Sequence, residues 1–101
     1  MLELRPNCEN CGKALPPDAL DARICSYECT FCAGCVEGVL SNVCPNCGGG
    51  FVPRPVRPSR SWKGPHLGKH PASTTMKHRP VDPAAHAQFA ATIRTIPPEK
   101  R

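Results

Sequence analysis

Large apolar and aromatic residues are scarce in this chain. Only five of its 101 residues are Phe, Tyr or Trp, and a domain of fewer than about 70–80 residues rarely gains more than ~3–5 kcal/mol from its core alone. No apolar run approaches the roughly 18 residues that a membrane span needs. The first residues also lack the apolar stretch of a secretion signal. We therefore expect a cytoplasmic protein with no membrane partner, whose small fold is held together by something other than a large core.

Two further absences divide the chain. No cysteine follows residue 47, and no histidine precedes residue 66. Residues 1–50 carry three basic and six acidic side chains, a net charge of −3, whereas residues 51–101 carry ten basic and two acidic ones, a net charge of +8. Nine of the 13 prolines also follow residue 52. We therefore predict a cysteine-rich domain over residues 1–52, called the head, and a basic, proline-rich tail over residues 53–101.

The head contains eight cysteines with the spacing C-x2-C-x13-C-x3-C-x2-C-x2-C-x8-C-x2-C. Disulfides seldom persist in a reducing cytosol, where clustered cysteines usually bind metal. Zinc takes four sulfur ligands in a tetrahedron, so eight cysteines fill two sites with none left over. In the turns at 8–12 and 44–48 a glycine follows the second cysteine, and glycine accepts a positive φ without steric cost. We predict two Zn2+ ions held by Cys8, Cys11, Cys25, Cys29, Cys32, Cys35, Cys44 and Cys47.

The spacing leaves two ways of dividing the cysteines between the ions. In the interleaved arrangement, the two sets are Cys8, Cys11, Cys32 and Cys35, and Cys25, Cys29, Cys44 and Cys47. In the nested arrangement, the two similar turns share one ion, as in a zinc ribbon, and the four middle cysteines form a local site. A redox dithiol normally lies beside a βαβ pattern, which the sequence does not show. An iron–sulfur cluster stays open as an alternative.

The order of the cysteines resembles that of a RING finger, in which four pairs of ligands alternate between two ions in a cross-brace. The resemblance lies in Cys25 and Cys29, the following CxxC, a short helix over residues 36–42 and the final Cys44-Pro-Asn-Cys47. It implies the interleaved arrangement and a small metal-stabilised α+β domain, a RING-like or treble-clef two-zinc fold with few short strands and one short helix. RING domains usually have a histidine among the middle ligands, whereas here every ligand is cysteine.

A closer resemblance covers more of the chain. Residues 1–8, 24–35, 43–58 and 70–74 are similar to a family of short bacterial proteins known only as domain of unknown function 1272. The similarity implies a bacterial, cytoplasmic protein, and it carries no activity with it.

Few segments of the head show a clear secondary-structure pattern. We expect a strand or extended segment over residues 1–7, a strand over residues 22–26 and a flexible exit after Cys47 that ends in a strand. Apolar residues at positions 36, 39 and 40 follow the i, i+3, i+4 pattern of a short helix over residues 36–41.

One helix is predicted in the tail, over residues 82–96. Asp82 is a good N-cap and Pro83 fits the first helical position. Phe89, Ile93 and Ile96 would share its apolar face. The rest of the tail, a basic linker over residues 53–81 and the end over residues 97–101, is expected to be largely disordered.

The linker carries a basic residue at every third position, namely Arg54, Arg57, Arg60 and Lys63. Closely spaced prolines favour an extended polyproline-type chain with three residues per turn, so these side chains would lie along one side. Such a stripe fits the phosphates of a nucleic acid, with Trp62 stacking on a base. A solvated linker, which is the favoured interpretation, and docking on the acidic head are the alternatives.

The sequence shows no catalytic group of residues. The head has no histidine to act as a base, the chain has no phosphate-binding glycine loop, and full four-cysteine sites leave zinc no position for water. We therefore expect a non-enzymatic module that binds another protein through its zinc-stabilised head, with no small-molecule substrate. A redox switch based on thiols and zinc and nucleic-acid binding through the tail are the alternatives.

Overall fold

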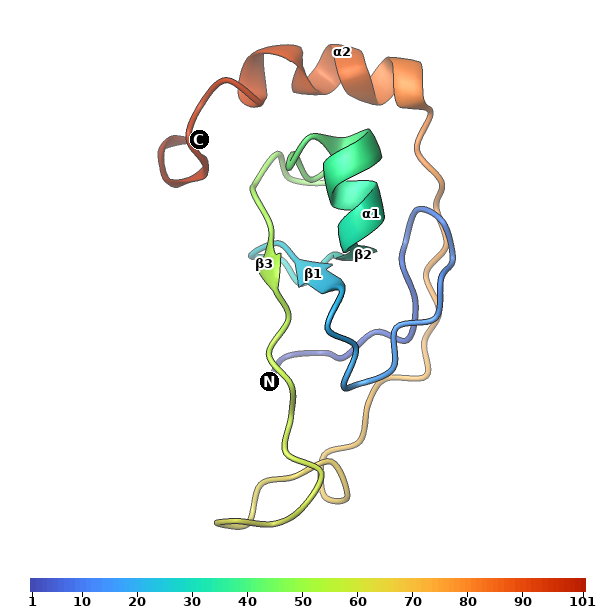
Figure 1. The fold of residues 1–101 in the computed structure, drawn as a ribbon, viewed down its shortest axis with the longest axis vertical. Coiled ribbons are helices and arrows are strands. Elements are labelled where there is room, and N and C mark those ends of the chain that lie inside the picture. The colour runs from blue at the N-terminus through green and yellow to red at the C-terminus, as the bar shows by residue number, and fades with distance from the viewer.

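A three-stranded antiparallel sheet lies at the centre of the molecule (Figure 1). In the computed structural model, which describes residues 1–101, the strands are β1 (Ala22–Ile24), β2 (Thr30–Cys32) and β3 (Val52–Pro53), in the order β2-β1-β3. Arg23 of β1 is paired with Phe31 of β2 and with Pro53 of β3. The strand expected over residues 22–26 thus ends at Ile24, where the turn into β2 begins. The sequence did not indicate β2, since three residues are too few to show a periodic pattern.

A short helical segment follows β2 directly and includes the helix expected over residues 36–41 except for its last residue, Ser41. It consists of α1 (Ala33–Cys35) and the π-helical η1 (Val36–Leu40). The helix ends at Leu40, because Ser41 and Asn42 adopt left-handed φ values of 53° and 56°, a conformation in which asparagine is enriched. The Asn42 side chain accepts a hydrogen bond from the Phe51 amide at 2.9 Å. This bond directs the chain from the helix back to β3.

The core of the head is small and rich in sulfur. Its fully buried side chains are Phe31, Leu15, Leu40, Val43, Thr30, Cys8 and Cys44. Phe31 makes an edge-to-face contact with Phe51, with ring centroids 5.4 Å apart, a geometry that aromatic pairs favour. Two cysteines from different turns therefore lie in the same apolar core as the largest side chains of the sheet and the helix.

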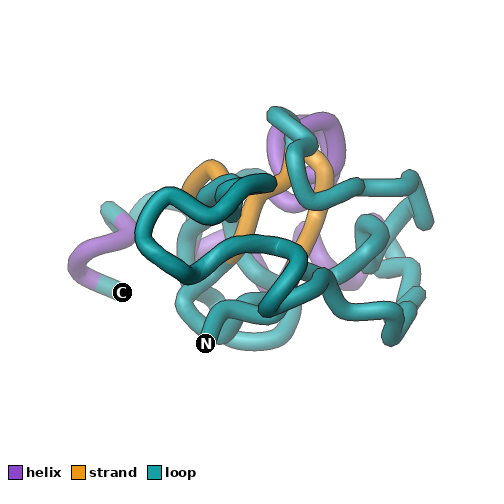
Figure 2. Tube along the Cα trace, turned by 90° about the horizontal axis from the view of Figure 1, so that it is seen from below, coloured by secondary structure: helices purple, strands orange, loops and turns teal.

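The tail is ordered, which corrects the expectation of disorder over residues 53–81. It leaves β3, turns at the far end of the molecule and returns along the head to α2 (Figure 1). Seen from that end, loops lie in front of the strands (Figure 2). On the return path the Ser73 amide donates to Leu4 O at 3.0 Å, and the Arg79 amide donates to Glu9 O at 2.7 Å. A proline-rich chain is already extended, so it loses little conformational entropy when its backbone docks in this way.

The helix in the tail lies against η1 of the head. It is α2 (Pro83–Ile93), and the Asp82 carboxylate accepts a hydrogen bond from the Ala84 amide at 3.1 Å, as an N-cap does. His86 is buried on the inner face and donates from Nε2 to Leu40 O at 2.9 Å. Ile93 also lies on the inner side, because a Cβ at Gly48 would be 3.7 Å from its Cδ1.

The end of the chain, expected to be disordered, is also bound to the head. Residues 98–100 form the short 3-10 helix η2 (Pro98–Lys100). The Arg101 guanidinium then donates to Asn42 O at 2.7 Å and to Gly48 O at 3.2 Å. The tail therefore contacts the head at both of its ends.

Candidate metal centre

The turns at 8–12 and 44–48 have the same backbone geometry. In each, the glycine amide donates to the carbonyl of the first cysteine, at 3.0 Å for Gly12 and at 2.8 Å for Gly48. Both glycines have a φ of +79°, which residues with a side chain rarely adopt. Each turn thus closes on itself, and the two sulfurs that it carries belong to one group.

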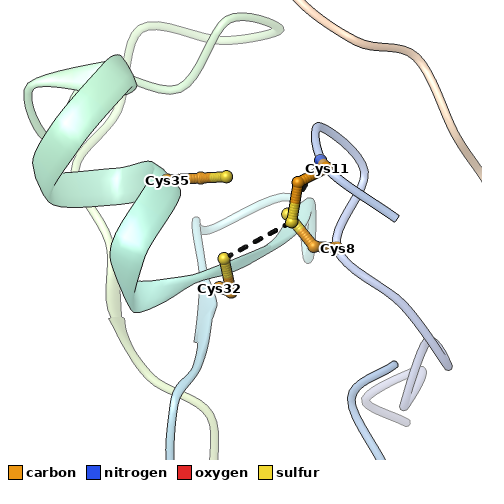
Figure 3. Close-up of side chains that lie close together, drawn as sticks. All are labelled: Cys8, Cys11, Cys32 and Cys35. Carbon is orange, nitrogen blue, oxygen red and sulfur yellow. Dashed lines mark hydrogen bonds between the residues drawn. The ribbon is translucent and has the colours of Figure 1, made fainter. Parts of the chain in front are cut away.

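Four sulfurs from the first turn and from the junction of β2 and α1 come together in one group (Figure 3). They belong to Cys8, Cys11, Cys32 and Cys35 and lie within 4.8 Å of one another. Cys11 Sγ is 3.7 Å from Cys32 Sγ, and sulfurs bound at about 2.3 Å to a tetrahedral zinc ion would be about 3.8 Å apart. Only Cys11 is exposed. The group therefore has the ligand number, spacing and burial of a four-sulfur metal site.

A second group forms beside the second turn. The sulfurs of Cys25, Cys44 and Cys47 lie within 4.8 Å of one another. Cys29, the fourth cysteine expected here, is buried but lies outside that limit, and its sulfur accepts a hydrogen bond from Asn46 Nδ2 at 3.4 Å. The structure therefore brings seven of the eight predicted cysteines together in the interleaved order and places Cys29 next to the second group.

Burial disfavours the charged form of several of these thiols. It raises the pKa of Cys35 to about 12, and it also raises the pKa of Cys44 and of Cys32. A hydrogen bond from the Lys13 backbone amide instead lowers the pKa of Cys11. The three buried thiols with raised pKa values are therefore protonated at neutral pH in the metal-free head, and a bound metal ion has to displace their protons.

Two asparagines, which the sequence analysis did not single out, contact the sulfurs. Asn10 Nδ2 donates to Cys35 Sγ at 3.2 Å, and Asn46 Nδ2 donates to Cys29 Sγ at 3.4 Å. Each asparagine precedes the second cysteine of its turn, and this repeated position is the signal that would have revealed them. Amide donors stabilise a thiolate and orient it toward a metal. The two asparagines therefore have the same role in the two turns.

The same two asparagines bind different parts of the molecule. Asn10 Oδ1 accepts a hydrogen bond from the Val81 amide at 2.9 Å, and Asn10 O accepts one from His78 at 3.1 Å. Asn46 instead donates to the buried Glu9 carboxylate at 3.3 Å. The first turn is therefore joined directly to the tail, whereas the second turn is joined to the first.

Comparison with known proteins identifies relatives of this chain. Residues 1–57 match the family described as "Protein of unknown function (DUF1272)". The chain belongs to this family. It is 58% identical over 80 residues to an uncharacterised protein of Rhizobium meliloti (strain 1021), which covers 79% of this chain and 89% of the relative. No solved structure matches it.

The resemblance to domain of unknown function 1272 is thus confirmed, and the match includes all eight cysteines of this chain. The family's description names no activity. The structure contains no helix that is both long enough and apolar enough to cross a bilayer.

In this DUF1272 protein the predicted basic stripe is divided into an inner and an outer half. Arg54 is only 4% exposed, and its guanidinium donates to Arg5 O, Leu15 O and Pro16 O at 2.9–3.3 Å. Arg57 donates to carbonyl groups of Leu2 and His70. Arg60 and Lys63 are exposed. The inner two arginines therefore hold the tail on the head, and only the outer two face solvent.

Proposed function

We propose that this protein is a structural zinc protein with two four-cysteine sites, whose head serves as a non-catalytic module for binding another cytoplasmic protein. The observation that carries the proposal is the group of four sulfurs at Cys8, Cys11, Cys32 and Cys35, all within 4.8 Å of one another. One group of four sulfurs and a second of three, with Cys29 beside it, fit two structural zinc sites, which are typically closed by four protein ligands each. The interleaved order of the two groups supports a cross-brace of the RING type.

Cys29 is the proposed fourth ligand of the second site. The two turns are alike in that each asparagine donates to a sulfur from outside its own turn. Asn10 bonds to Cys35, a member of the first group, so by the same geometry Asn46 bonds to Cys29 as a member of the second. With Cys29 the second site would have four sulfur ligands, like the first.

Native mass spectrometry of the purified protein tests the metal content. We expect two zinc ions in the wild-type protein and one in each of the variants Cys29→Ser and Cys35→Ser, one variant for each site. An iron or iron–sulfur mass would overturn the zinc assignment. Two tightly held ions in the Cys29→Ser variant would show that the second site does not use Cys29.

The protein-binding role is supported by an exposed apolar surface next to the second group. Tyr27 is 73% exposed, and a groove beside it is lined by Cys47, Ile93, Ile96 and Pro98. Exposed aromatic residues are enriched in protein interfaces. Metal-loaded wild-type protein and a Tyr27→Ser variant with the same zinc content should therefore differ in partner capture. A partner bound by the wild type should bind the variant at least tenfold more weakly when purified and titrated, and equal binding would contradict the role of this surface.

A redox switch is the second candidate, because each sulfur group contains one exposed cysteine, Cys11 in the first and Cys47 in the second. Exposed thiolates are open to oxidation, which would release metal and unfold the head. The candidate requires that mild peroxide releases zinc and that a reductant with zinc restores the fold. Retention of both ions under mild peroxide would rule it out.

A further inference from the structure

The far end of the tail is a closed loop over residues 58–67, at the opposite end of the molecule from α2 (Figure 1). The Leu67 amide donates to Pro58 O at 2.9 Å and closes the loop. Within it, the Gly64 amide donates to Ser61 Oγ at 3.0 Å, and His66 bonds to Gly64 O at 2.8 Å. The loop therefore has internal hydrogen bonds of its own, which stabilise its backbone conformation.

The loop presents the only tryptophan of the protein to solvent. Trp62 is 72% exposed, although tryptophan is buried on average in folded proteins. The guanidinium carbon of Arg60 lies 5.4 Å from the ring centroid, in a cation–π contact. Because a cation covers one face of an aromatic ring, the other face is available for a flat ligand to stack on.

The surroundings of Trp62 are strongly basic. Residues 53–81 contain seven Arg and Lys residues and no Asp or Glu. Arg54 and Arg57 are bound to backbone carbonyls, but the side chains of Arg60, Lys63 and Lys69 are exposed on or next to the loop. The groove beside Trp62 contains one acidic residue, Asp18, from the head.

We propose that this loop binds single-stranded nucleic acid, in addition to the proposed protein-binding role of the head. A base stacks on the free face of Trp62, and Arg60, Lys63 and Lys69 neutralise the neighbouring phosphates. A single strand fits better than a duplex because its bases are free to stack. It also fits better than a lipid surface, because one tryptophan with an arginine on its face offers little apolar area for insertion.

The test uses the full-length, zinc-loaded protein and a fluorescently labelled single-stranded 20-mer of mixed sequence, as DNA and as RNA. Because Trp62 is the only tryptophan, stacking should quench the protein's intrinsic fluorescence on titration with unlabelled strand. Three neutralised phosphates give a slope of about −2 in log affinity against log salt, so affinity should fall about twentyfold between 50 and 200 mM salt.

Variants assign the binding to the loop. Trp62→Ala should weaken binding about tenfold, as expected for the loss of one stacked base, and Arg60→Ala should lower the salt slope by about 0.7. Arg94→Ala, which removes an exposed arginine outside the loop, is the matched control and should bind like the wild type. The proposal is overturned if no binding is seen at 50 mM salt or if Trp62→Ala binds as tightly as the wild type. Binding to vesicles rich in phosphatidylserine without binding to the 20-mer would also overturn it, in favour of a lipid surface.

Discussion

The head and the tail reach an ordered structure by different means. The head has a core, a sheet and two groups of cysteine sulfurs of its own. The long stretch of tail between β3 and α2 has no regular secondary structure, and it is held by hydrogen bonds to backbone groups of the head, such as Ser73 to Leu4 and Arg79 to Glu9. The difference shows that a segment poor in apolar residues can be ordered when another part of the chain supplies its hydrogen-bond partners. It also implies that the order of the tail depends on the fold of the head.

Removing the metal should give the largest effect, because the proposed zinc ions stabilise the head and the tail relies on the head. Zinc binding contributes an apparent ~10–16 kcal/mol in small zinc peptides, more than the core of so small a domain supplies. Excess chelator should therefore abolish hydrogen-exchange protection in the head and, at the same time, in α2 of the tail. Protection of α2 that persists after chelation would show that the tail folds independently.

Substitution of two arginines tests whether the inner half of the basic stripe is structural while the outer half only faces solvent. Arg54→Ala should lower the free energy of unfolding by about 2–4 kcal/mol, because it leaves three carbonyls of the head without a donor. Arg60→Ala should change it by less than about 0.5 kcal/mol, since Arg60 is exposed. Urea unfolding of the zinc-loaded proteins measures both values. Similar losses of unfolding free energy in the two variants would contradict a structural role for Arg54.

Substitution of the two asparagines compares a metal site that is hydrogen-bonded to the tail with one that is not. Asn10→Ala and Asn46→Ala should each weaken zinc binding about 10–100-fold at one site, as is typical when a group that orients a ligand is lost. Only Asn10→Ala should also increase hydrogen exchange at the Val81 amide, which bonds to Asn10 Oδ1. Zinc affinity measured by competition with a chelator, together with exchange at residue 81, tests the contrast.

A smaller effect should come from Glu3, whose carboxylate binds the tail. A hydrogen bond from Ser73 and a second from Arg5 lower the pKa of Glu3 below its ordinary value of 4.5. A lowered carboxylate pKa stabilises the fold above pH 4.5, and this contribution is lost as the pH falls through the folded pKa. Because Glu3 is partly exposed, Glu3→Gln should cost at most about 0.5 kcal/mol at pH 7.

This loss should shrink toward zero in acid, and comparison of the two proteins in urea at pH 7 and pH 4 measures it. A loss that is the same at both pH values would assign the effect to something other than the charge of Glu3.

Much of the head could be predicted, because its turns and its sulfur groups depend on which residue types occur at fixed spacings. The repeated turns with a glycine after the second cysteine indicated two similar sites, and the RING-like order implied the interleaved grouping of sulfurs that the structure contains. The position of Cys29 relative to the second group was not predictable, because it depends on the conformation of the turn between β1 and β2.

The tail was predicted poorly because its contacts leave no pattern in the sequence. Its bonds to the head run mainly between backbone groups or from arginines to backbone carbonyls, and a carbonyl is present at every residue whatever its type. Arg54 and Arg60 look alike in the sequence, yet one is buried and the other exposed. The helix α2 was the exception, because its N-cap at Asp82 and the proline that follows are local signals.

Both sulfur groups also precede the tail in the order of synthesis. The four cysteines of the first group are all synthesised by residue 35, and those of the second by residue 47, whereas α2 and Arg101 follow later. At a synthesis rate of about 5–20 residues per second, residues 48–101 take roughly 3–11 s. In that interval the head can bind the proposed zinc ions, so that α2 and Arg101 meet a surface that is already folded.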